Sequence, residues 1–337
     1  ALPIYRDSCT RMGLDQMIEE PRRQDRVAHT RGGDEQDTHG AFIRPCRANE
    51  KRGTQPETLD LPGETTQFIA EMTNGDTMTN LHRATLENRG ILKVSGDDTV
   101  TFLQGLVSND VSNVADNRTV YAALLTPQGK FLYDFFLYGQ GGAILMETER
   151  DRMTDLTKKL SMYKLRAQVD LEDVSDAWSV IAIWGLEAPA ACGLSGDLGM
   201  TAAWHGGLAV IDPRLAAAGV RALIPADGNP DLPGDAAQFA NYDSHRLMLG
   251  LPDGSRDLVL EKAILLESGF DELHGVDWHK GCYMGQELTA RTKYRGLVKK
   301  RLVPITIDGA LPAPGTPVML NRKKVGEVRS GRDGRAL

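Results

Sequence analysis

Three apolar runs separated by very short polar turns limit the folds open to this chain. The runs are VYAALLT, FLYDFFLYG and AILMET, and the turns between them are PQGK and QGG. Turns of this length join neighbouring antiparallel strands, so the stretch predicts a β-meander. No GxGxxG or GxxxxGK(S/T) phrase follows a predicted strand, which argues against a nucleotide-binding parallel sheet. We therefore expect an α+β fold with antiparallel sheets.

Helices are predicted on either side of this meander. The phrase ILKV predicts a strand, and SGDDTVTFLQGLVSND predicts a helix whose first turn is capped by Asp97 or Asp98. After the meander, we expect Asp151 to cap a helix over DRMTDLTKKLSMY, because its apolar residues are spaced three and four apart. AQVDLEDV and WSVIAIWG then return to the pattern of strands.

Composition divides the chain into four predicted segments. Residues 1–77 are polar and lack a sustained apolar period, so we expect a disordered extension, either a native flexible tail or sequence upstream of a real coding start at Met78. The phrase QFIAEM, from Gln67, is an exception with a helical pattern. Residues 78–224 and 225–296 form two α+β regions, and the Pro/Gly/Asp-rich phrase IPADGNPDLPGD lies where they meet. In residues 297–337 the phrases LVKKRLVPITI and TPVMLNRKKVGEVRS predict strands of a small β-barrel, and the stop at GRAL leads us to expect that it is incomplete.

Charge, hydropathy and cysteine usage exclude several classes of protein. No apolar run approaches the roughly 20 residues that span a bilayer, and the amino end lacks a secretory pattern, so we expect a cytoplasmic protein with no membrane contact. The net charge of −7 argues against a general nucleic-acid coat. The four cysteines contain no CxxC pair, which predicts reduced thiols and no metal site; they are Cys9, Cys46, Cys192 and Cys282.

The stretch HKGCYMGQELTARTKYRG, residues 279–296, carries the most chemistry. Gly281 permits a tight turn before Cys282, and Lys280 beside it favours the thiolate, so the pattern indicates a reactive thiol. The alternative is a small buried thiol that fills a gap beside Tyr283. A metal site that combines Cys282 with upstream histidines has no recognised spacing to support it.

Four phrases resemble a known family. LHRATLENRGILKVSGDDTVTFLQGLVSNDV, LTPQGKFLYDFFLY, RLMLGLP and KGCYMGQELTARTKYRG are similar to the YgfZ-type folate-binding proteins, relatives of the glycine-cleavage T-protein, an aminomethyltransferase. The resemblance runs from Leu81 to the end of the chain. It implies a T-protein-like fold, with antiparallel sheets and helices around a central folate channel and a carboxy-terminal β-barrel.

The same resemblance implies a function. It points to a protein that binds tetrahydrofolate or a derivative and supports iron–sulfur cluster assembly or repair. Its expected partners are iron–sulfur assembly proteins or client enzymes, including enzymes that modify tRNA. Cys282 carries over as the functional cysteine, with Lys280 lowering its pKa or contacting an anion. Gly281 carries over as part of the signature, and its remaining residues carry over as candidate folate-binding residues, namely Tyr283, Gly285, Gln286 and Glu287.

The parent aminomethyltransferase chemistry is only half represented. In GKFLYDFF, Tyr133 replaces one acid of the T-protein pair and Asp134 keeps the other, and AVIDPRLAAAGVRAL has no counterpart of the GYTGE-like phrase. A one-carbon transferase therefore remains the alternative function, and enzyme activity stays open. Asp134 either accepts hydrogen bonds from the pterin ring or faces solvent on an alternating strand.

Three further features have a functional and an ordinary interpretation. Asn109 and Asp110 match the family phrase, which makes them candidate folate-binding residues, but they also suit a helix C-terminal turn. Arg246 faces an anion or forms a surface ion pair. The basic run Arg291 to Arg301 meets a polyglutamyl folate tail, tRNA or an acidic partner, or is a solvated face.

Overall fold

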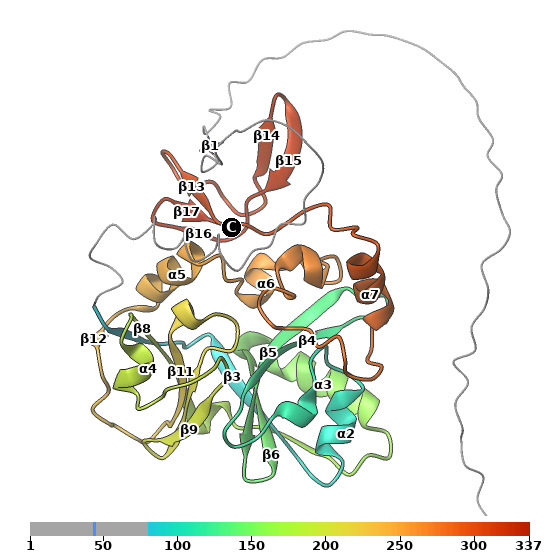
Figure 1. Cartoon of the computed structure of the whole chain (residues 1–337), viewed down its shortest axis with the longest axis vertical. Coiled ribbons are helices and arrows are strands. Elements are labelled where there is room, and N and C mark those ends of the chain that lie inside the picture. The colour runs from blue at the N-terminus through green and yellow to red at the C-terminus, as the bar shows by residue number, and fades with distance from the viewer. Residues whose placement is uncertain (1–42, 45–79) are drawn as a thin grey trace, which may run out of the picture. The chain divides into compact units, whose positions relative to one another are not determined.

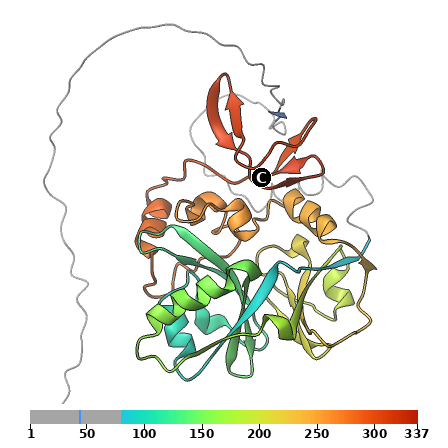
Figure 2. The ribbon, with the colours of Figure 1, turned by 180° about the vertical axis from the view of Figure 1, so that it is seen from behind.

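The computed structural model describes residues 80–337 and the backbone of the short strand β1 (Ile43–Arg44). Figures 1 and 2 show these residues from opposite sides. The predicted disordered extension, residues 1–77, falls almost entirely outside the described residues. A helical phrase expected at QFIAEM, from Gln67, also lies outside them.

One sheet of five antiparallel strands contains the predicted meander. Its strand order is β4-β5-β6-β3-β7. The strands are β3 (Arg89–Ser95), β4 (Val120–Leu125), β5 (Phe131–Gln140), β6 (Ala143–Glu149) and β7 (Asp170–Asp173). β4, β5 and β6 are consecutive neighbours, which confirms the prediction made from the two short turns.

Two helices cover the outer face of this sheet. α2 (Thr99–Gln104) and α3 (Met153–Lys164) bury Leu103, Leu156 and Leu160 in one apolar cluster with the strands. The predicted caps differ from the structure. The Asp98 carboxylate accepts a 2.7 Å hydrogen bond from the distant backbone N–H of Gln168 and does not cap its own helix. Asp151 lies in a 3₁₀ turn just before Met153, where α3 begins.

A second sheet has the order β12-β2-β8-β11-β10-β9. Its strands are β2 (His82–Thr85), β8 (Trp178–Trp184), β9 (Thr201–Trp204), β10 (Gly207–Ile211), β11 (Val220–Pro225) and β12 (Asp235–Ala236). Only the β12–β2 pair is parallel. One apolar cluster takes side chains from both sheets, including Tyr121 and Phe136 from the first and Trp184 and Leu223 from the second. The two sheets therefore share one core.

The second half of the chain adds short helices and small sheets. The helices are α4 (Ala188–Ala191), α5 (Phe239–Met248), α6 (Gly254–Asp257) and α7 (Gln286–Tyr294). β13 (Ile305–Ile307), β16 (Gly331–Arg332) and β17 (Arg335–Ala336) form a sheet with β1, while β14 (Pro317–Leu320) and β15 (Lys323–Glu327) form a hairpin. α5 and α6 lie between these carboxy-terminal strands and the two larger sheets (Figure 1).

The expected α+β architecture is thus present, and its carboxy-terminal strands are shorter than the sequence suggested. The phrase LVKKRLVPITI forms a strand only at Ile305–Ile307. The four-segment division of the chain stays a prediction. Among the described residues, no helix has the length and apolar character needed to cross a bilayer.

Candidate functional site

A buried charge cluster joins the two large sheets. Glu147 on β6 accepts a 2.8 Å hydrogen bond from Arg89 Nε on β3 and forms a second ion pair with Arg221 on β11 of the other sheet. The Tyr138 hydroxyl donates to the same carboxylate at 2.6 Å. Burial by itself raises the pKa of Glu147, but the two guanidinium groups outweigh it and lower the pKa to about 2. Glu147 is therefore a permanent anion at the centre of the fold.

A third arginine reinforces this centre. Arg214 forms a bidentate pair with Asp212, at 3.0 Å and 2.8 Å. Its guanidinium lies 4.8 Å from the centroid of the Phe136 ring, and that of Arg221 lies 4.0 Å from the same ring. The Phe136 ring thus stabilises both planar cations by cation–π interactions in a region from which water is excluded. Sequence reasoning missed these arginines, because an isolated charge in a strand or loop is usually a solvent-facing residue.

Asp134 on β5 lies beside the cluster and is 1% exposed. Its Oδ2 accepts a 2.9 Å hydrogen bond from the Tyr121 hydroxyl, whereas its Oδ1 has no hydrogen-bond partner. Burial raises the pKa of Asp134, and the positive charge of Arg89 opposes that shift. The structure therefore excludes the solvent-facing alternative for Asp134.

Asp134 lines a small, partly enclosed cavity of about 10 Å³, close to the room needed by one water molecule. The cavity is lined by Leu86, Asn88, Arg89, Asp134, Phe136, Arg214, Arg221, Phe239, Tyr242, Arg246, Pro252 and Asp253. Four of the lining residues are arginines. A planar heterocycle can enter only if some of these side chains move.

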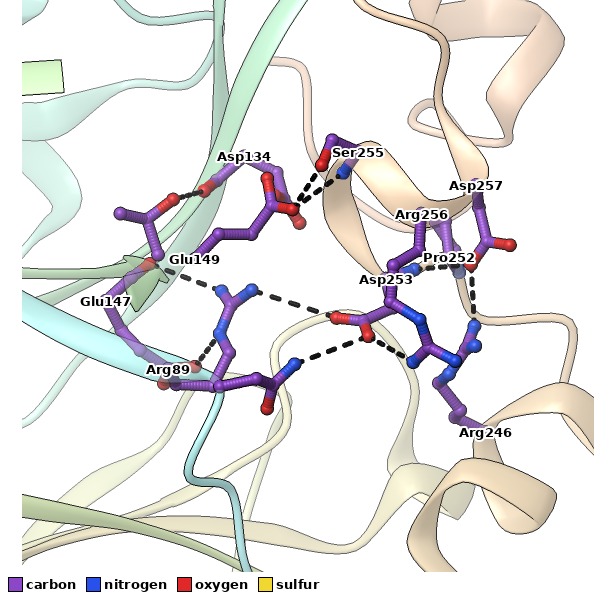
Figure 3. Close-up of polar contacts among 12 residues, drawn as sticks. Arg89, Asp134, Glu147, Glu149, Arg246, Pro252, Asp253, Ser255, Arg256 and Asp257 are labelled. Atoms are coloured by element: carbon purple, nitrogen blue, oxygen red, sulfur yellow. Dashed lines mark hydrogen bonds and ion pairs between the residues drawn. The ribbon is translucent and has the colours of Figure 1, made fainter. Parts of the chain in front are cut away.

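The segment Pro252–Asp253 closes one side of the cavity. The Asp253 carboxylate lies between two cations, 3.9 Å from Arg89 and 2.7 Å from Arg256 (Figure 3). Arg214 donates a 3.4 Å hydrogen bond to the carbonyl of Pro252. The side chains that surround Asp134 thus also hold the neighbouring loop.

Arg246 is 2% exposed and belongs to a structural network. It donates to Asp243 and Asp257, each at 2.7 Å, and to the Ser330 hydroxyl at 2.6 Å. Ser330 precedes β16, so the guanidinium ties α5 and α6 to the carboxy-terminal strands. Arg246 therefore forms buried ion pairs, and not the surface ion pair considered from the sequence.

The KGCYMGQE signature lies elsewhere, against the PQGK turn between β4 and β5. Gly285 has φ +82°, and a Cβ at this position would lie 2.5 Å from the Thr126 carbonyl oxygen and 2.9 Å from Gly129 Cα. Gly129 has φ +75°, and its own added Cβ would meet Gly285 O at 2.7 Å. Two glycines therefore face each other, which lets the backbones approach closely.

The rest of the signature is distributed between surface and interior. Cys282 is exposed, which excludes the buried gap-filling alternative. Tyr283 is buried, and burial raises its pKa to about 12. Gln286 is half-buried at the start of α7, and the exposed Glu287 pairs with Arg291 one turn later. None of these residues lines the Asp134 cavity.

Lys280 points inward. Its ammonium donates two 2.6 Å hydrogen bonds, to the carbonyl oxygens of Val107 and Asn109. Burial lowers the pKa of Lys280 to about 8, although Asp110 and Asp277 oppose the shift. The sequence had suggested that the charge of Lys280 acts on the exposed thiol. In the structure the ammonium binds these two carbonyls instead.

Asn109 and Asp110 stabilise the turn that receives these bonds. The Asn109 side-chain amide donates at 2.7 Å to the carbonyls of Tyr121 and His274. Asp110 accepts from the Ser112 hydroxyl and backbone N–H, and these bonds lower its pKa. The ordinary interpretation, a turn after the first helix, describes both residues well.

Asn109 also borders an open groove of about 580 Å³. The groove is lined by Asn109, Asn113, Arg118, Thr119, Val120, Tyr121, Asp197, Leu198, Pro213, Asp271, His274, Val276, Asp277 and Trp278. Within the described part of the chain, no three His, Cys, Asp or Glu side chains are close enough together to hold a metal ion.

Comparisons with known proteins agree with this architecture. Residues 84–193 match the model of the GCVT N-terminal domain, and residues 299–337 match the CAF17 C-terminal beta-barrel domain. The aminomethyltransferase T of the Bartonella henselae glycine cleavage system has a TM-score of 0.60 at 15% identity, over 77% of this chain and 78% of that one. Its likeness establishes a T-protein-like fold.

Sequence relatives define the family more narrowly. The human mitochondrial iron-sulfur cluster assembly factor IBA57 is 34% identical over 268 residues, which cover 73% of this chain and 74% of the human protein. The chain belongs to the IBA57 family. The Mycosarcoma maydis IBA57 homolog is 35% identical over 69% of this chain, which spans only 58% of the length of that relative.

Membership of the IBA57 family corrects the expected location. The relatives from Mycosarcoma maydis, human and mouse are all named as mitochondrial proteins. The cytoplasmic prediction is therefore wrong. It rested on the absence of a secretory pattern and of a membrane span, and neither absence distinguishes the cytoplasm from an organelle interior.

In this IBA57 family member, the basic run is partly neutralised. Arg291, Lys293 and Arg301 pair with Glu287, Asp271 and Glu272 respectively. The comparisons provide no support for tRNA contact by this run, which stays a prediction.

Proposed function

We propose that this IBA57 family member is an accessory protein of iron–sulfur cluster assembly or repair that also binds a reduced folate. Its YgfZ-like signature supports a role in maintaining cluster-dependent enzymes, and the location of its relatives supports a mitochondrial setting. Tetrahydrofolate or a derivative is the proposed ligand. That its client enzymes include enzymes that modify tRNA stays a prediction.

The unpartnered Oδ1 of Asp134 is the observation that carries the folate proposal. A buried carboxylate oxygen without a donor is costly, so a ligand that supplies N–H groups gains from pairing with it. The pterin ring carries such donors on one edge and a carbonyl acceptor beside them, and Arg89 and Arg214 border the same cavity. The donor set fits the pterin, while the volume requires side chains such as that of Asp253 to shift.

Cys282 is the proposed functional thiol. It is exposed on the protein surface, while Cys192, the other described cysteine, is buried. Burial raises the pKa of Cys192 to about 12, which keeps that thiol protonated and inert. An exposed thiolate can bind an iron–sulfur intermediate transiently. The cluster is then cargo, received from and passed to other proteins.

The folate proposal is tested by titrating the full chain with tetrahydrofolate and following tryptophan fluorescence. We expect saturable binding by the wild type, by Cys282→Ala and by the exposed-acid control Glu187→Gln. Asp134→Asn should bind at least about tenfold more weakly, because it replaces the charged acceptor with an amide. Equal affinity in Asp134→Asn, or no binding by a folded wild type, would reject the Asp134 site.

The cluster proposal needs a separate test in cells that lack their own copy of this protein. Cys282→Ala should lower the activity of mitochondrial cluster-dependent enzymes, while Gly281→Ala beside it should not. Unchanged enzyme activity with Cys282→Ala, at equal protein abundance, would reject a role for the thiol.

An aminomethyltransferase is the second candidate, because Asp134 is buried with a raised pKa as a proton-transfer group would be. Formation of methylene-tetrahydrofolate from an aminomethyl donor, abolished by Asp134→Asn, would favour it. Absence of this product with a folded sample would reject the aminomethyltransferase and leave the accessory role as the proposed function.

A further inference from the structure

The side chain of Lys280 raises a question that its sequence neighbourhood does not answer. It lies two residues before the exposed Cys282, yet it is only 8% exposed. Its Nζ lies 5.2 Å from the centroid of the buried Tyr283 ring. A lysine is rarely buried without a specific reason, because desolvating its charge is costly.

Its acceptors explain the burial. Both are backbone carbonyls, those of Val107 and Asn109, in the turn that follows α2. A carbonyl pair in a turn has no helical or strand partner of its own, so the ammonium satisfies both at once. The two hydrogen bonds therefore join the Cys282 loop to a segment more than 170 residues earlier in the chain.

Other contacts fix the two ends of the same loop. Asp277 Oδ1 accepts hydrogen bonds from the backbone N–H groups of His279 and Lys280, at 2.6 Å and 2.9 Å. On the far side of the cysteine, the N–H of Met284 donates at 3.0 Å to the carbonyl of Gly105.

Between these anchors the loop is open. Nothing lies within 4 Å of the position that a Cβ at Gly281 would occupy. The position of Cys282 thus depends on the residues that flank it. On one side the Tyr283 ring is buried in the core, and on the other the Lys280 side chain is anchored by its two hydrogen bonds.

We propose that Lys280 is a positioning residue that holds the Cys282 loop on the turn after α2, so that the thiol is presented in a fixed place to an incoming cluster or partner. The functional part of this inference rests on the role proposed above for Cys282. Lys280 acts through hydrogen bonds to backbone carbonyls, so a second side chain with several donors can replace it.

The test is a nitroxide spin label on Cys282, in the full chain with Cys9→Ser and Cys46→Ser. The buried Cys192 is left in place. We expect an immobilised spectrum in the wild type, and a mobile component in Lys280→Met, which keeps the length of the side chain but donates no hydrogen bond. Lys280→Arg should restore the immobilised spectrum, because a guanidinium can donate to both carbonyls.

Two variants separate positioning from loss of fold. Lys293→Met removes an exposed lysine of α7 that pairs with Asp271, and it should leave the spectrum unchanged. If Lys280→Met does not fold, Lys280→Gln keeps an amide donor and should give an intermediate spectrum. An immobilised label in folded Lys280→Met or Lys280→Gln would overturn the proposal, and so would a mobile label in Lys280→Arg.

The spin-label experiment and the enzyme assays test the two proposals separately. If Cys282→Ala has no effect on cluster-dependent enzymes, the thiol has no role, whatever the label shows. If Cys282 is required, Lys280→Met should reduce those enzyme activities towards the Cys282→Ala level, and Lys280→Arg should not. Full activity of Lys280→Met would overturn the functional part of the inference.

Discussion

The Tyr121 hydroxyl donates its hydrogen bond to only one oxygen of Asp134, and the other oxygen has no hydrogen-bond partner. Asp134 lines a cavity of about 10 Å³. Removing the hydroxyl in Tyr121→Phe leaves the whole carboxylate without a donor. We expect a loss of about 1–3 kcal/mol in the free energy of unfolding, because the carboxylate stays buried.

The two side chains should also be energetically coupled. In a double-mutant cycle with Asp134→Asn, the coupling energy should be about 0.5–3 kcal/mol, measured by urea unfolding. Additive effects of the two substitutions would show that the hydrogen bond contributes little.

The close approach of Gly285 and Gly129 predicts a large effect from one methyl group. Gly285→Ala places a Cβ 2.5 Å from Thr126 O at a φ of +82°, so we expect a loss of about 2–4 kcal/mol in the free energy of unfolding. Gly281→Ala is the matched control, since open space surrounds that position. Its effect should stay within about 0.5 kcal/mol. Similar thermal midpoints for both variants would contradict this packing.

His245 predicts a pH dependence of stability. Its ring stacks on Trp184 with centroids 5.7 Å apart, and burial lowers its pKa from 6.5 to about 4. Between these values the unfolded chain binds a proton that the folded chain does not, so stability falls as the pH drops from about 6.5 to about 4.

The loss from this one residue should be roughly 3 kcal/mol by pH 4. His245→Phe keeps the stacking and should remove most of that slope in urea unfolding, while the exposed His279→Gln should retain it. An unchanged slope in His245→Phe would assign the effect to other groups.

Arg246 should contribute strongly to stability through its buried ion pairs. Arg246→Met leaves Asp243 and Asp257 buried without this partner, at an expected cost of about 3–5 kcal/mol. Hydrogen exchange should rise first in the strands after Ser330, which the guanidinium contacts. The exposed Arg166→Ala is the control and should be nearly neutral. Unchanged hydrogen-exchange protection in those strands would show that Arg246 does not stabilise them.

Local pattern determined much of this fold. The short turns PQGK and QGG fix β4, β5 and β6 as neighbours, since a tight turn leaves a strand no other place to pair. The quoted signature phrases were enough to indicate a T-protein-like architecture, and the glycines within them mark where backbones must approach closely. Asp134 was recognised as a candidate for the same reason: its phrase keeps one of two expected acids.

Tertiary structure decided the rest, because burial and partners depend on which distant segments meet. Glu147, Arg89 and Arg221 are ordinary charged residues until two sheets bring them together away from water. The sequence placed Lys280 beside Cys282, where its charge was expected to act on the thiol. Only the fold supplies the carbonyls of Val107 and Asn109, which a buried ammonium must bind, and it thereby turns the lysine inward.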